Sequence, residues 1–98
     1  MMPRVSVRTV PAFERFARRL ADQHPEFTRL LAQAIEILEA DPHSAGRAHS
    51  ILKLKGVAAG EGQYRLRLGR FRFRYDIAGR EVVLIYCGLR REDTYRDR

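Results

Sequence analysis

The sequence of residues 64–75 is YRLRLGRFRFRY, and this stretch decides the fold. On both sides of Gly69-Arg70, apolar or aromatic residues alternate strictly with arginine, which is the period of a β-strand. A two-residue loop with glycine at its first position suits a type II′ turn, so the stretch predicts a β-hairpin. Counting outward from the turn gives the predicted pairs Leu68–Phe71, Arg67–Arg72, Leu66–Phe73, Arg65–Arg74 and Tyr64–Tyr75.

This register sorts the side chains of the hairpin onto two faces of a sheet. The apolar and aromatic residues share one face, which we expect to pack under helices. Like charges directly opposite one another destabilise a sheet by up to about 1 kcal/mol per pair, and a merely solvated face would mix both signs of charge. We therefore interpret the second face as a site for an external anion, because phosphate oxygens match forked guanidinium donors. Tyr64 and the neighbouring aromatics would add base stacking if they are exposed. The second face carries Arg65, Arg67, Arg72 and Arg74.

The first part of the chain predicts one strand and two helices. Residues 4–10 alternate weakly between apolar and polar side chains, as in a strand. Pro11 and Pro25 each suit the first turn of a helix, where the missing N–H costs nothing. Apolar residues recur at helical spacing after both prolines, and the second helix is expected to end before Asp41-Pro42. The short connection predicts an antiparallel helical hairpin.

The second part of the chain predicts a sheet. Residues 56–62 are rich in glycine and are expected to form a loop, and residues 78–80 a turn. Residues 81–87, EVVLIYC, form a nearly continuous apolar run, which is typical of a strand buried on both faces. The predicted order is β-α-α-β-β-β, an α+β fold in a single domain over residues 1–98. The helical hairpin is expected to pack on one face of a largely antiparallel, twisted sheet.

Composition excludes several classes of function. The hydrophobic fraction of 45% is ordinary for a globular protein. No apolar run approaches the roughly 18 residues of a membrane span, and the start of the chain lacks the apolar core of a secretory signal. The single cysteine, Cys87, is expected to be a buried thiol, which suits the cytoplasm. His24, His43 and His49 lack metal-site spacing, so no metal and no cofactor are predicted.

The net charge of +7 is concentrated in the second half of the chain. Residues 1–50 hold seven arginines and six acidic residues, whereas residues 51–98 hold twelve basic and six acidic residues. A one-sided basic surface favours a polyanionic partner, which is a nucleic acid, an anionic membrane or an acidic protein. Solubility alone is the alternative explanation.

Five stretches of the chain are relevant to its family, namely residues 54–56 (LKG), 63–67 (QYRLR), 69–75 (GRFRFRY), 82–86 (VVLIY) and 88–96 (GLRREDTYR). Together they resemble the RelE/ParE superfamily of bacterial toxins. The order of elements also matches, so the resemblance covers almost the whole chain. It implies a small cytoplasmic toxin of a type II toxin–antitoxin system, held in a hetero-oligomer by its cognate antitoxin. RelE-like members cleave mRNA on the ribosome and ParE-like members poison DNA gyrase, and the sequence leaves both activities open.

The resemblance to RelE-like ribonucleases also implies site residues for metal-independent RNA cleavage. The strand arginines would stabilise the charge that develops on a pentavalent phosphate. Tyr95, surrounded by guanidiniums, would take the proton of the 2′-hydroxyl, and Arg90 would bind phosphate or assist the leaving oxygen. The implied catalytic set is Arg65, Arg67, Arg72, Arg90 and Tyr95. Further RNA contacts are predicted at Lys53, Lys55, Arg70, Arg74 and Arg91, although the two lysines also fit solvated edge-strand charges.

Overall fold

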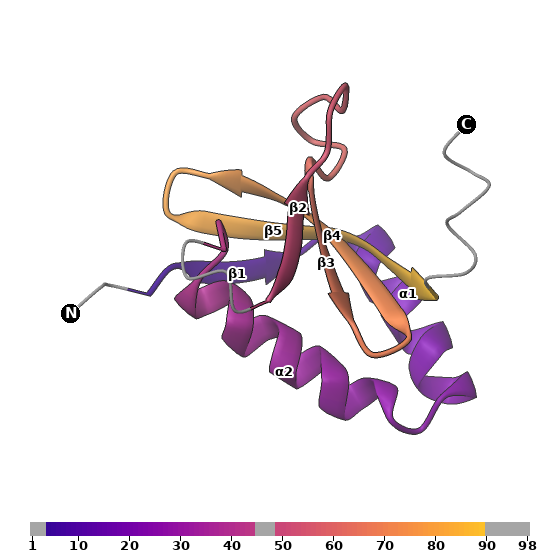
Figure 1. Ribbon diagram of the computed structural model, residues 1–98. Coiled ribbons are helices and arrows are strands. Elements are labelled where there is room, and N and C mark those ends of the chain that lie inside the picture. The colour runs from indigo at the N-terminus through magenta and orange to yellow at the C-terminus, as the bar shows by residue number, and fades with distance from the viewer. Residues whose placement is uncertain (1–3, 45–48, 90–98) are drawn as a thin grey trace.

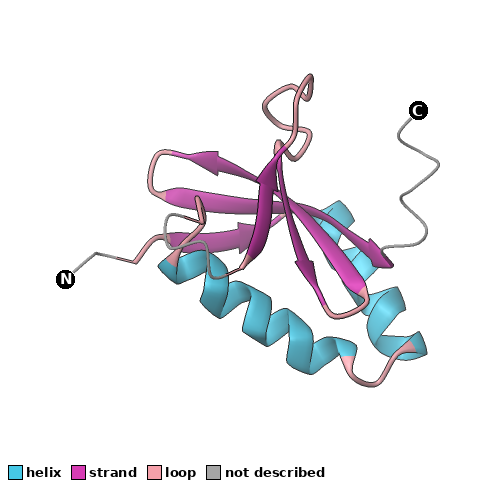
Figure 2. Cartoon of the chain, viewed as in Figure 1, coloured by secondary structure: helices cyan, strands magenta, loops and turns pink. Residues whose placement is uncertain are grey.

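The computed structural model describes residues 4–44 and 49–89, which form two helices and a sheet (Figure 1). The sheet order is β1-β5-β4-β3-β2, with β1 parallel to β5 and the other neighbours antiparallel. Both helices lie on one side of this sheet (Figure 2), which confirms the α+β architecture. No helix of the described residues is long and apolar enough to cross a membrane. The elements are β1 (Ser6–Thr9), α1 (Pro11–Gln23), α2 (Phe27–Ala40), β2 (Ser50–Lys53), β3 (Tyr64–Leu68), β4 (Phe71–Ala78) and β5 (Glu81–Leu89).

The predicted hairpin is formed by β3 and β4, and its register is confirmed at all five predicted pairs. Gly69 has a φ of +60°, whereas Arg70 is not among the described residues with positive φ. A type II′ turn requires this combination, because only its first central residue adopts positive φ. The alternation continues beyond the predicted pairs, since β4 extends to Ala78.

Two details of the prediction are wrong, namely the number of strands and the start of the second helix. The short segment Ser50–Lys53 forms an additional strand, β2, which pairs antiparallel with β3. Its four residues alternate too briefly to predict a strand, and the exposed edge of β3 supplies the pairing. The second helix begins at Phe27, and Pro25 lies in the turn before it.

The aromatic residues of the hairpin form the core under the helices. Phe71, Phe73 and Tyr75 are fully buried. The ring of Phe27 on α2 lies 5.0 Å from that of Phe71 and 6.0 Å from that of Phe73, measured between centroids. Tyr64 stacks on Tyr75 on the same side, at 5.4 Å. These rings therefore do not face the arginines, and the exposure on which base stacking depended is not found for Phe71, Phe73 and Tyr75.

A β-bulge in β5 reverses the alternation of that strand. Tyr75 lies opposite Leu84, but Arg74 lies opposite Tyr86, so Ile85 is an extra residue. Leu84 and Cys87 consequently both belong to the core, although they are three positions apart. The apolar run is confirmed as a largely buried strand, and the bulge brings Tyr86 onto the side of Arg74.

Two buried groups predict a loss of stability at alkaline pH. Burial raises the pKa of the Cys87 thiol to about 12, and burial raises the pKa of the Tyr75 hydroxyl well above its ordinary value. Both groups stay neutral in the folded chain while they ionise in the unfolded chain. Stability is therefore retained below the ordinary pKa values and falls as the pH rises past them, by about 1.4 kcal/mol per pH unit for each group.

Urea unfolding between neutral and alkaline pH measures this effect. We expect the Cys87→Ala and Tyr75→Phe variants to be less stable than the wild type at neutral pH, because each loses buried contacts and Tyr75 donates a 2.7 Å hydrogen bond to the carbonyl of Pro42. Each variant should nevertheless lose less of its own stability on going to alkaline pH. A free energy of unfolding that falls with pH as steeply in both variants as in the wild type would contradict the role of these two buried groups.

Candidate nucleic-acid interface

The side of the sheet opposite the helices carries the hairpin arginines, and we call it the arginine face. It consists of Arg65, Arg67, Arg72 and Arg74 together with the residues that the register places beside them. Helix α1 reaches this side where Phe16 packs against Tyr86, with ring centroids 4.9 Å apart. The arginine side chains are half-buried. Two cross-strand rows run from β2 to β5, namely Ser50–Arg67–Arg72–Gly88 and Leu52–Arg65–Arg74–Tyr86.

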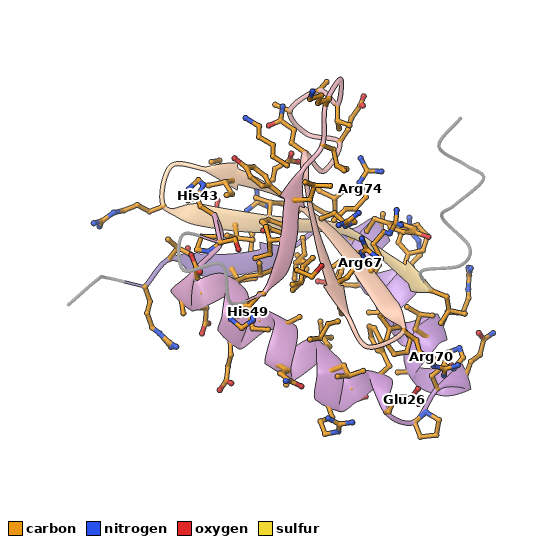
Figure 3. All side chains as sticks on the ribbon, in the orientation of Figure 1. Glu26, His43, His49, Arg67, Arg70 and Arg74 are labelled. Atoms are coloured by element: carbon orange, nitrogen blue, oxygen red, sulfur yellow. The ribbon has the colours of Figure 1, made fainter. Side chains whose placement is uncertain are left out.

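Arg67 is the residue of this face with the clearest unmet hydrogen-bonding capacity. Its Nε atom is buried and has no hydrogen-bond partner. None of the ion pairs between described residues involves Arg67, and Figure 3 shows its side chain on the central part of the sheet. A buried donor without a partner costs about 1–3 kcal/mol. An anion bound on this face would offset that cost.

Arg74, predicted as an RNA contact, holds the glycine-rich loop against the sheet. Its Nε donates to the carbonyl of Gly62 at 3.1 Å, and its Nη2 donates to the carbonyls of Gly62 at 2.9 Å and Glu61 at 3.1 Å. Two of its three guanidinium nitrogens are thus committed to the backbone. The phosphate contact predicted for Arg74 would therefore use its Nη1 atom.

Asp76 is a buried acid on the arginine face that the sequence interpretation missed. Its carboxylate accepts hydrogen bonds from the amide of Gly62 at 3.1 and 3.2 Å and from the amide of Gln63 at 3.0 Å. The carboxylate therefore anchors the same loop. The signal was present in the sequence, because the alternation of β4 continues from Arg74 to Asp76.

The remaining predicted RNA contacts that the structure describes are dispersed. Arg70 pairs with Glu26 at 2.7 Å and contacts Nδ1 of His24 at 2.9 Å, at the tip of the hairpin (Figure 3). This hydrogen bond from Arg70 lowers the pKa of Glu26. Lys53 lies opposite Tyr64, with its Nζ 5.7 Å from the ring centroid, and so belongs to the helical side of the sheet. Lys55 is exposed at the start of the glycine-rich loop.

Two residues of the predicted catalytic set, Arg90 and Tyr95, lie outside the described residues, as does the predicted RNA contact Arg91. The structure brings Arg65, Arg67 and Arg72 together on one face. It also places Tyr86 on this face. The sequence did not predict this position of Tyr86, because a continuous apolar run gives no sign of a bulge. In the part of the chain that the structure describes, no three His, Cys, Asp or Glu side chains form a group that could hold a metal ion.

A separate groove of about 310 Å³ is lined by residues of both helices, including Phe13, Ala17, Phe27 and Leu31. It contains none of the hairpin arginines. The groove and the arginine face are therefore separate surfaces of the molecule.

Comparison with solved structures finds several proteins with a similar fold. The toxin–antitoxin complex RelBE2 of Mycobacterium tuberculosis gives a TM-score of 0.66 at 21% identity and covers 92% of this chain and 95% of that one. The archaeal RelE–RelB complex of Pyrococcus horikoshii gives 0.65 at 21% identity, with 88% and 94% covered. The YoeB dimer of Staphylococcus aureus gives 0.67 at 14% identity, with 86% and 94% covered. Neither the protein-family models nor the curated proteins match the chain. The chain has the fold of the RelE-like toxins, as the resemblance predicted.

Because Arg74 anchors the glycine-rich loop, alanine substitutions at two glycines of this loop are expected to destabilise the chain unequally. Gly62 has a φ of +83°, and an added Cβ would lie 2.9 Å from the Cβ of Arg74. Gly60 has a φ of +95° but no atom within 4 Å of an added Cβ. Gly60→Ala is therefore the matched control for backbone strain, and Gly62→Ala should destabilise the chain by roughly 1–3 kcal/mol more, as overpacking does. Urea denaturation of both variants measures the difference, and equal losses would show that the contact with Arg74 is unimportant.

Proposed function

We propose that this chain is the toxin of a type II toxin–antitoxin pair and that it cleaves mRNA as a RelE-like ribonuclease. The observation that carries this proposal is the buried Nε of Arg67, which lacks a partner on a sheet face shared with Arg65 and Arg72. Guanidiniums gathered in this way repel one another unless an anion lies among them. The fold shared with RelE-like toxins supports the same conclusion.

The chemistry expected of this face is stabilisation of a phosphate. When a 2′-hydroxyl attacks the adjacent phosphodiester, negative charge grows on the phosphate oxygens. Fixed guanidiniums that already point at these oxygens lower the barrier, because they need no reorganisation during the reaction. Arg67 and Arg72 lie directly opposite each other, so they form the smallest unit able to hold one phosphate from two sides. Proton transfer is left to groups such as Tyr95, which lies outside the described residues.

Purified ribosomes programmed with a defined mRNA test the proposed activity directly. Arg67→Ala and Arg72→Ala should each reduce the cleavage rate by roughly 10²–10³-fold, the usual effect of removing one donor from a developing oxyanion. Arg29→Ala, on the exposed side of α2, removes the same charge and should leave cleavage unchanged.

The matching control assay measures supercoiling by DNA gyrase, the target of ParE-like toxins. Intact mRNA together with trapped gyrase–DNA complexes would replace the ribonuclease proposal with a gyrase inhibitor. Cleavage by the wild type that survives both arginine substitutions would keep the ribonuclease but reject the arginine face as its site.

A cognate antitoxin is the partner we propose, and the +7 charge indicates that it is acidic. Both the mycobacterial and the archaeal structures are toxin–antitoxin complexes. Expression of this chain alone should arrest growth, and co-expression of a small acidic protein encoded next to it should restore growth and co-purify with it. Growth that continues normally in the absence of such a protein would contradict a toxic function.

A further inference from the structure

Tyr86 is the aromatic residue that the bulge of β5 places on the arginine face. It lies opposite Arg74, in the row that also contains Arg65. Without the extra residue Ile85, strict alternation would direct Tyr86 to the same side as Leu84, into the core. The bulge therefore presents a phenol to a surface that is otherwise dominated by guanidiniums.

Gly88 determines how the phenol lies on that surface. A Cβ added to Gly88 would lie 2.9 Å from Cζ and 3.2 Å from Cε2 of Tyr86, and closer still to its hydroxyl oxygen. The ring thus extends along the strand over Gly88, which leaves no room for a side chain there. Gly88 is not among the glycines of positive φ, so the space for Tyr86 is the reason for glycine at this position.

Because of this placement, the backbone of Tyr86 lies in one arginine row and its hydroxyl lies in the neighbouring row. Tyr86 starts in the row of Arg74, but its hydroxyl lies over Gly88, which faces Arg72 in the neighbouring strand. Phe16 of α1 packs edge-on against the phenol ring, with centroids 4.9 Å apart and planes at 69°. The ring is therefore held from the side of the helix, and its hydroxyl is directed to the row that contains Arg67 and Arg72.

We propose that the Tyr86 hydroxyl is a further substrate ligand, which donates a hydrogen bond to the RNA phosphate held by Arg67 and Arg72. The inference rests on the proposed function, since it names an additional group of the same site. A hydroxyl suits this role beside guanidiniums, because it adds a directed donor to the phosphate without adding more positive charge. The proposal requires no proton transfer by Tyr86, so that step stays with other groups.

Binding of a short single-stranded RNA with methylated 2′-hydroxyls tests the proposal without requiring cleavage. Tyr86→Phe keeps the ring and its contact with Phe16 but removes the hydroxyl. We expect it to weaken RNA binding by roughly tenfold, the loss typical of one hydrogen bond to a charged group, with an unchanged dependence on salt. Arg67→Ala should weaken binding and also reduce the salt slope by about 1. Tyr64→Phe is the matched control, because Tyr64 lies on the helical side of the sheet against Tyr75.

A second pair of variants tests whether Gly88 acts through Tyr86. Gly88→Ala should displace the ring and weaken RNA binding at least as much as Tyr86→Phe does. Added to Tyr86→Ala, which removes the ring, the same substitution should cost little further affinity. Urea unfolding of each variant separates these effects from a loss of the fold.

The outcomes separate this inference from the proposed function. RNA binding by Tyr86→Phe equal to that of the wild type, while Arg67→Ala is impaired, would overturn the role of Tyr86 and keep the arginine face. Equal losses in Tyr64→Phe and Tyr86→Phe would also overturn it, because they would indicate a general effect of removing a phenol. A wild type that binds no RNA would overturn the role of Tyr86, whereas the cleavage assay on programmed ribosomes decides the proposed function separately.

Discussion

The interaction on which the structure depends is the burial of the aromatic side of the β3–β4 hairpin. Phe71, Phe73 and Tyr75 are completely enclosed under the helices, and burial of each such side chain contributes about 1.5–3 kcal/mol. The opposed arginine pairs on the other side cost up to about 1 kcal/mol each. The hydrophobic contribution is larger, so it holds the arginines in a register that they would not adopt by themselves. A slip by one residue would exchange the two faces.

The repulsion on the arginine face is relieved unevenly. Arg74 donates to the backbone carbonyls of the glycine-rich loop, and Asp76 accepts from the amides of the same loop. Further along the sheet, Arg8 pairs with Glu81 at 3.2 Å. The protein's own groups thus satisfy the end of the face near the loop and β1. Arg67, in the row nearer the Gly69-Arg70 turn, keeps a buried donor without a partner, and this difference localises the anion site that we propose.

The fold by itself does not indicate the activity of this chain, whereas the side chains of the candidate site do. Structures with the same fold are only 14–21% identical to this chain, which is expected because many sequences satisfy the same pattern of helices over a sheet. Fold alone does not determine function, so the activity has to be argued from particular side chains. Here those side chains are Arg67 and Arg72, with Tyr86 and Gly88 beside them on the same face.

The sequence alone determined the hairpin register and the separation of arginines from aromatic residues, because both follow from a period of two around Gly69. It also determined the two helices and the loop at residues 56–62. Only the tertiary structure decided which arginines are engaged, since the partners of Arg74 and Arg70 are distant in sequence. The strand Ser50–Lys53 and the bulge at Ile85 likewise depend on the neighbouring strand, which supplies the pairing. Local pattern fixes which side chains share a face, whereas contacts between distant segments decide what those side chains bind.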